Sequence, residues 1–132
     1  MIGIVITTHS TFAEGLKAAC EMIAGLQEAM EAVNFMGNEE LLELGERIKN
    51  IGKQYEDGCI YVVDLLNATP FNASLLAIAG TENVVLTGAS LPMLLELLTM
   101  RIGYEGTCEE LAREIKASSG DYVEVKHSRD IF

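Results

Sequence analysis

The chain has 132 residues, of which 49% are hydrophobic, and its 20 acidic residues against 9 basic ones give a formal net charge of −11. This length fits one domain with a core of its own, and we expect residues 1–132 to form it. The excess negative charge argues against nucleic acid as a partner, and the absence of an apolar run of about 18 residues argues against membrane insertion.

The first part of the chain predicts a strand, a helix and a second strand. Ile2–Thr7 is a short apolar run rich in β-branched residues, which is typical of a buried strand. Thr11–Glu14 has the pattern of a capping box, so we expect a helix to begin there. Its apolar residues recur at helical spacing: Phe12, Leu16, Ala19 and Ile23. A weaker strand is predicted over Ala29–Phe35.

The middle of the chain repeats this order. Asn38 is expected to cap a second helix, whose apolar stripe comprises Leu41, Leu44, Ile48, Ile51 and Tyr55. The apolar run Cys59–Val63 predicts a third strand, which ends at Asp64. Thr69-Pro70 then has the pattern of a helix N-cap followed by proline, with the helix over Phe71–Ala79.

The last part of the chain contains more helix than strand. Asn83–Leu86 predicts a fourth strand, and Ser90 is expected to cap a largely apolar helix over Leu91–Arg101. A second capping box at Thr107–Glu110 opens another helix. Tyr122–Lys126 alternates apolar and polar residues, which predicts a last strand with one wet face, at an edge or facing a partner.

Alternation of strands and helices predicts an α/β fold: an open, mostly parallel, twisted sheet with helices on both faces. In the common strand order 2-1-3-4, ligands bind beyond the carboxyl ends of the strands, where the winding reverses.

Two residues at this edge point to chemistry on an imidazole. His9 and Asp64 both follow apolar strands, and they meet if the first and third strands are neighbours. A carboxylate at one ring nitrogen fixes the tautomer and leaves the lone pair of the other nitrogen free for attack. We therefore expect His9 to be a nucleophile, attacking through Nε2, and Asp64 to hold Nδ1–H and stabilise the positive ring that forms.

The surroundings of this pair suit an anion. Helices are predicted to begin just after His9 and just after Asp64, and helix N-termini present free N–H groups and partial positive charge. Thr69 can add a hydroxyl donor, and Ser10 is a weaker candidate of the same kind.

Other kinds of site lack their patterns. The sequence contains no GxGxxG, no GxxxxGK[ST] and no GxSxG. No His, Cys or carboxylate cluster has metal-ligand spacing, so we expect neither a metal nor a cofactor. Three cysteines without a CxxC indicate a reduced, cytoplasmic protein whose thiols lie in the core. His127 lies in a polar tail and is expected at the surface.

Three segments of the sequence carry a resemblance to a known family: IVITTHSTFAEGL at the start, DLLNATPFNASL from Asp64 and TGASLPMLLELL from Thr87. Together they resemble the mannose-family EIIA domain of the bacterial phosphotransferase system for sugar uptake. The resemblance covers essentially the whole chain. It implies a homodimer in which the last strand, antiparallel, crosses to the sheet edge of the other subunit. It also implies a phosphotransferase whose histidine, His9, accepts a phosphoryl group from the phosphocarrier HPr and passes it to an EIIB component, with Asp64 in support.

One departure from the family pattern falls in the predicted phosphoryl-binding loop, formed by Asn67, Ala68 and Thr69. The family carries D-x-x-G-G-[ST]-P-x-N, and here Asn67-Ala68 replaces the two glycines. Alanine is penalised by roughly 1–2 kcal/mol in a left-handed conformation that asparagine tolerates better. This change leaves open a regulatory, phosphorylation-sensing domain without efficient onward transfer, and the fold alone also admits a flavodoxin-like binder of a small ligand.

Overall fold

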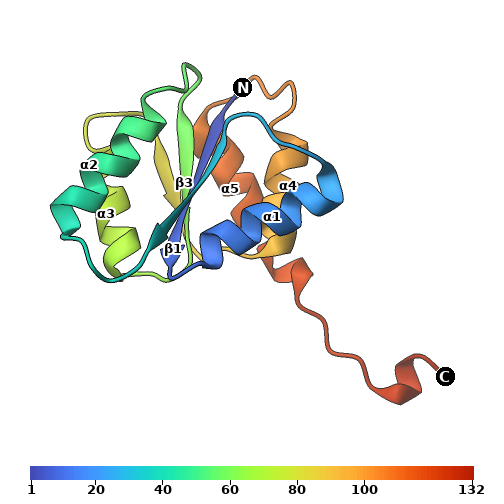
Figure 1. The fold of residues 1–132 in the computed structure, drawn as a ribbon. Coiled ribbons are helices and arrows are strands. Elements are labelled where there is room, and N and C mark those ends of the chain that lie inside the picture. The colour runs from blue at the N-terminus through green and yellow to red at the C-terminus, as the bar shows by residue number, and fades with distance from the viewer.

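The computed structural model describes all residues, 1–132, as a twisted sheet between two layers of helices (Figure 1). In chain order the elements are β1 (Gly3–His9), α1 (Phe12–Ala24), β2 (Met30–Phe35), α2 (Leu41–Gly52), β3 (Cys59–Val63), α3 (Thr69–Ile78), β4 (Val84–Leu86), α4 (Leu91–Met100), α5 (Cys108–Ser118) and two short 3₁₀ turns, Ser119–Tyr122 and Ser128–Asp130. No helix is long and apolar enough to cross a membrane.

The four strands are parallel and lie in the order β2-β1-β3-β4. This confirms the predicted strand order and the parallel sheet. β1 lies between β2 and β3, so side chains from three strands meet at its carboxyl end. The strand extends beyond the predicted Thr7, because His9 is still paired in register with Phe35 of β2.

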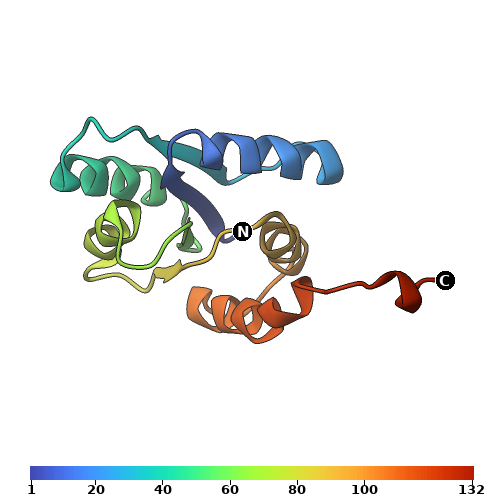
Figure 2. The same cartoon turned by 90° about the horizontal axis from the view of Figure 1, so that it is seen from below.

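The sheet has a hydrophobic cluster on each face, and side chains of β1 pack into both, which explains its run of apolar residues. Ile4 and Ile6 pack with α1, α4 and α5 in the larger cluster, whereas Val5 packs with α2 and α3 in the smaller one. Figure 2 shows the same division, with α2 and α3 on one side of the sheet and α4 and α5 on the other. The predicted placement of helices on both faces is therefore confirmed.

The inward face of α1 differs from the predicted stripe. Its buried residues are Ala13, Leu16 and Cys20, whereas Phe12 is 45% and Ile23 is 62% exposed. Ala13 and Cys20 thus replace the predicted Phe12 and Ala19, one position further along, and the buried stripe ends before Ile23. In α2 the prediction is better, since Leu44 and Ile48 are fully buried.

The predicted caps were only partly right. The capping box at Thr107 and the Ser90 cap are both present. α2 begins two residues later than expected, with Glu40 rather than Asn38 at its N-cap position. At α1 the Thr11 side chain makes no capping bond; instead the Glu14 N–H donates to Oδ1 of Asn34 in β2 (3.3 Å).

The segment Tyr122–Lys126 is not a strand of this chain's sheet. Tyr122 ends a 3₁₀ turn, and the chain then runs outward from the body of the molecule (Figures 1 and 2). Val123 and Val125 are 80% and 90% exposed. A strand requires a neighbour for its backbone hydrogen bonds, and this segment has none within the chain. Exchange of the segment between subunits stays a prediction.

All three cysteines are buried and free, as predicted for core residues. Burial raises the pKa of the Cys59 thiol to about 12, and burial is also the main cause of the raised pKa values of Cys20 and Cys108. The thiols therefore stay protonated and serve as small packing groups.

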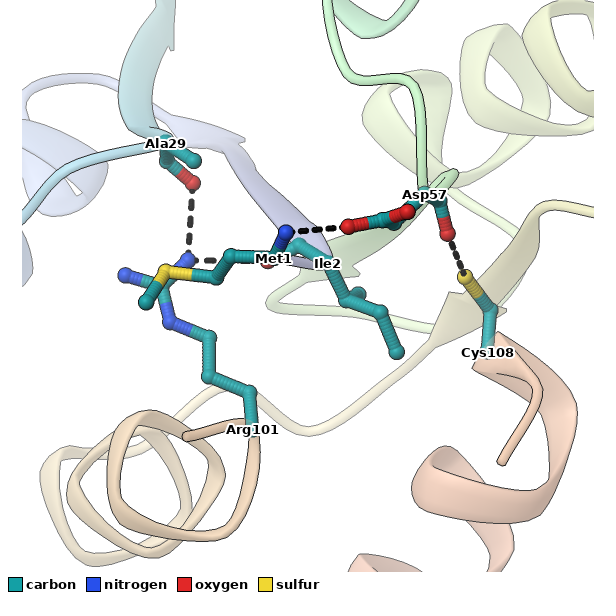
Figure 3. Close-up of polar contacts among 6 residues, drawn as sticks. All are labelled: Met1, Ile2, Ala29, Asp57, Arg101 and Cys108. Atoms are coloured by element: carbon teal, nitrogen blue, oxygen red, sulfur yellow. Dashed lines mark hydrogen bonds and ion pairs between the residues drawn. The ribbon is translucent and has the colours of Figure 1, made fainter. Parts of the chain in front are cut away.

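At the edge of the sheet opposite His9, a buried arginine donates hydrogen bonds to backbone carbonyl oxygens (Figure 3). Arg101 follows α4 and is only 2% exposed. Its Nη1 donates to the carbonyl oxygens of Ile2 and Ala29, both at 2.9 Å, and its Nη2 donates to the Glu28 carbonyl at 2.6 Å. Burial lowers the pKa of the guanidinium. The carbonyl oxygens compensate for the water that Nη1 and Nη2 have lost, whereas Nε is buried without a partner.

Replacing this side chain should destabilise the fold without touching the other edge of the sheet. We expect Arg101→Met to lower the free energy of unfolding by about 2–4 kcal/mol, because three backbone carbonyl oxygens lose a charged donor, although the Ala29 carbonyl still accepts from the Ile4 N–H. Urea denaturation measures this. Arg113→Met is the matched control, since Arg113 forms an exposed pair with Glu109 and should change stability little. Equal effects of the two changes would contradict the role given to Arg101.

Candidate functional site

His9 is the point at which β1 emerges from the core. Thr7 and Thr8 before it are fully buried, whereas 44% of the His9 side chain is exposed. The strand therefore fixes the backbone of the histidine while its ring reaches the surface. A small hollow of about 250 Å³ adjoins it, lined by His9, Ser10, Phe35, Met36 and Gly37.

Asp64 contacts this imidazole directly, as the sequence predicts. Nδ1 of His9 lies 3.0 Å from Oδ2 and 3.2 Å from Oδ1 of Asp64. The backbone N–H of His9 also donates to Oδ2 (3.1 Å). Because a carboxylate accepts hydrogen bonds, this contact favours the tautomer with the proton on Nδ1 and leaves the Nε2 lone pair free.

The loop that follows Asp64 leads directly into α3. Asn67 is exposed, whereas Ala68 and Thr69 are half-buried. Thr69 is the first helical residue rather than the cap, and Ala68, at the cap position, has no side chain that could accept a hydrogen bond. The first-turn N–H groups of α3 therefore lack a side-chain partner, which suits an anion.

The structure brings His9 and Asp64 together but leaves the other four predicted residues outside their hydrogen bonds. Neither Ser10 nor the three loop residues, Asn67, Ala68 and Thr69, bond to the side chains of that pair. The backbone N–H of Ser10 donates instead to the Phe35 carbonyl (2.8 Å). His127 lies in the exposed tail, where its Nδ1 accepts from the Arg129 N–H (3.1 Å).

The backbone shows how the chain tolerates Asn67-Ala68 in place of two glycines. Asn67 has φ 63°, in the left-handed region, whereas Ala68 has φ −103° in extended backbone. The expected penalty for alanine therefore does not arise, because only the first position requires positive φ. Ser10, next to His9, is also left-handed, at φ 54°.

Sequence reasoning missed Phe35 as a neighbour of the histidine. The two ring centroids lie 6.1 Å apart with the planes at 75°, an edge-to-face arrangement. The predicted strand order puts the ends of β1 and β2 at the same edge of the sheet, but the register that makes His9 and Phe35 partners is seen only in the structure.

Comparison with known proteins now identifies the family. The family described as "PTS system fructose IIA component" matches residues 3–116. The chain belongs to the mannose/fructose EIIA family of the sugar phosphotransferase system. It is a phosphoryl-carrier component of such a system, and the resemblance inferred from the sequence is confirmed.

Individual relatives agree with this assignment. The chain is 31% identical to the fructose-specific EIIA component of Bacillus subtilis (strain 168), over 95% of this chain and 86% of that protein. It is 34% identical to the mannose-specific EIIAB component of Escherichia coli (strain K12), over 76% of this chain but only 32% of that longer protein. The EIIA crystal structure from Streptococcus agalactiae superposes with a TM-score of 0.85 at 28% identity, covering 95% of this chain and 97% of that one.

The loop geometry of this EIIA domain predicts that alanine is unfavourable at position 67 and that glycine is unfavourable at position 68. We expect Asn67→Ala to lower the free energy of unfolding by about 1 kcal/mol, because alanine is strained at positive φ. Ala68→Gly should also be destabilising, by about 0.5–1 kcal/mol, because it only adds freedom to the unfolded chain. Urea denaturation compares the two variants. Stabilisation by Ala68→Gly would show that residue 68, too, favours a glycine conformation.

Proposed function

We propose that this domain accepts a phosphoryl group on Nε2 of His9 from phospho-HPr and passes it to an EIIB component. The observation that carries the proposal is the Asp64 carboxylate at Nδ1, 3.0 Å away, on a ring whose other side is exposed. This arrangement gives a nucleophilic nitrogen that can be reached by another protein.

The transfer balances without a metal or an outside base. The Nε2 lone pair of His9 attacks phosphorus, the N–P bond of the donor's phosphohistidine breaks, and the donor imidazole leaves with the electron pair. The proton on Nδ1 of His9 stays in place, so the phosphorylated ring is cationic and lies against the negative Asp64. Onward transfer to EIIB reverses these changes, and the loose transition state leaves the protein mainly to position the groups.

The uncapped start of α3 supplies donors for the phosphoryl oxygens. We assign the backbone N–H groups around Asn67, Ala68 and Thr69 to this task, with the Ser10 and Thr69 hydroxyls as further donors. A helix N-terminus typically stabilises a nearby anion by about 0.3–1 kcal/mol. This contribution is modest, as a carrier that must release its phosphoryl group requires.

The surface around His9 suits protein partners with a basic face. Four large apolar side chains near this site are 45–59% exposed: Phe12, Met36, Leu65 and Leu66. They lie close to His9 or Asp64 in the sequence or line the same hollow. Residues 10–14, 36–40, 64–71 and 87–92, which follow the four strands, include four carboxylates and no Lys or Arg. One of these carboxylates, Glu39, forms an ion pair with Arg47 of α2. An apolar contact surface with carboxylates around it favours binding to carriers that have a positively charged face. We propose that HPr and EIIB are such carriers and that the transfer takes place in the cytoplasm.

Labelling through phosphoenolpyruvate, enzyme I and HPr tests the reaction. We expect His9→Ala to abolish acid-labile phosphorylation, and Asp64→Asn to slow it roughly ten- to hundredfold, because the positive ring loses its counter-charge. His127→Ala, which alters the other histidine, is the control and should label normally. Full labelling of His9→Ala would move the site elsewhere, and an unchanged rate in Asp64→Asn would limit that carboxylate to a structural role.

The outer edge of β4 supports the family's dimer for this chain. β4 pairs only with β3, and a groove of about 360 Å³ runs beside it. Apolar side chains from α3, β4 and α5 line most of the groove: Phe71, Leu75, Ile78, Val84, Val85, Leu86 and Ala112. We propose that Tyr122–Lys126 of a second subunit adds to this edge as an antiparallel strand, with residues 1–132 acting as one domain in each subunit.

Charged substitutions in the tail test this exchange. Val123→Asp with Val125→Asp should convert a dimer into a monomer, because the carboxylates would lose water against a groove in which seven of the ten lining residues are apolar and only Arg113 and Lys116 are cationic. Sedimentation equilibrium measures the mass in solution. Leu26→Asp is the control, since Leu26 is 93% exposed in the loop just after α1 and should not alter assembly. A wild-type protein that is already monomeric would contradict the proposal.

A further inference from the structure

We propose that Phe35 is a positioning residue for phosphoryl transfer: its ring holds the imidazole of His9 in the orientation that exposes Nε2. This inference rests on the proposed role of His9 as phosphoryl acceptor. The structural basis lies in the three strands that meet at the site.

His9 is held from both neighbouring strands. From the β3 side, Asp64 contacts Nδ1 at 3.0 Å. From the β2 side, the Phe35 ring lies edge-to-face with the imidazole, with centroids 6.1 Å apart. This separation is within the range of about 4.5–7 Å at which aromatic pairs interact favourably.

The pairing of β1 with β2 fixes Phe35 relative to the histidine. The two residues are register partners, and paired residues in a sheet project to the same face. The next ladder bond also ends on Phe35, since the Ser10 N–H donates to its carbonyl oxygen at 2.8 Å. Backbone and ring thus act together: the carbonyl fixes the turn after His9, and the ring lies beside the imidazole.

The hydrogen bond to Asp64 alone leaves the imidazole free to tilt. A carboxylate accepts Nδ1–H over a range of directions, and both its oxygens lie within reach here. The hollow of about 250 Å³ beside the ring provides room for such a tilt, and Phe35 is part of its wall. A smaller side chain at this position would enlarge the hollow and let Nε2 turn away from an approaching phosphoryl group.

Three variants separate positioning from packing. We expect Phe35→Leu to slow labelling of His9 about three- to tenfold, the effect expected from the loss of one aromatic pair. The decrease should occur with phospho-HPr and with the small donor phosphoramidate alike, because the ring acts on the histidine and not on the partner. Phe35→Tyr should keep the wild-type rate because it keeps the ring. Val33→Ala removes buried volume from the same face of β2 and should lower stability without slowing transfer.

The tautomer of His9, measured by ¹⁵N NMR of the ring, is the readout that a purely structural residue would leave unchanged. Phe35→Leu should reduce the share of the Nδ1–H form, and Phe35→Tyr should not. Wild-type labelling rates and tautomer shares in Phe35→Leu would overturn the inference while leaving the proposed function intact. If phospho-HPr fails to label the wild type, the proposed function fails, and the tautomer measurement still decides whether Phe35 orients the ring.

Discussion

Parallel pairing of β1 with β3 on one side and with β2 on the other is the constraint on which the site depends. His9 and Asp64 are 55 residues apart in the sequence, yet their strands end at the same edge because the connecting helices return the chain in the same direction. The histidine is thereby placed at the centre of three strand ends. This arrangement gives it two neighbours of different chemistry, a carboxylate and an aromatic ring.

The electrostatics of the site favour transfer over storage. The molecule carries a net charge of −11, and the segments that follow the strands contain no Lys or Arg. In the transfer that we propose, a phosphoryl group on His9 would therefore be stabilised mainly by the uncapped start of α3 and, through the positive ring, by Asp64. The same carboxylate repels the phosphoryl oxygens. With a stabilising contribution of only about 0.3–1 kcal/mol from a helix N-terminus, the group stays available to an acceptor that offers positive charge.

The sequence was sufficient for the features that depend on periodicity and direction. Apolar runs located the four strands, their alternation with helices implied the parallel order, and that order brought His9 and Asp64 together. The sequence was insufficient where a side chain contacts a residue that is distant in the sequence. Asn34 of β2 replaces Thr11 in capping the first turn of α1, and no local pattern signals such a distant partner. Phe35 was read as part of a strand, since its contact with His9 depends on register as well as strand order.

The two ends of the sheet divide stability and function between them. At the amino end, Arg101 joins three backbone carbonyl oxygens, and the N-terminal ammonium pairs with Asp57 (Figure 3). At the carboxyl end, Ser10 and Asn67 adopt left-handed backbone and α3 begins without a cap. Left-handed backbone is not confined to the carboxyl end, because Ala29 at the amino end has φ 52°; there Nη1 of Arg101 donates to the Ala29 carbonyl oxygen at 2.9 Å. A side-chain cap on α3 would occupy donors that we assign to the phosphoryl group, so under the proposed function the uncapped start of the helix keeps these donors free.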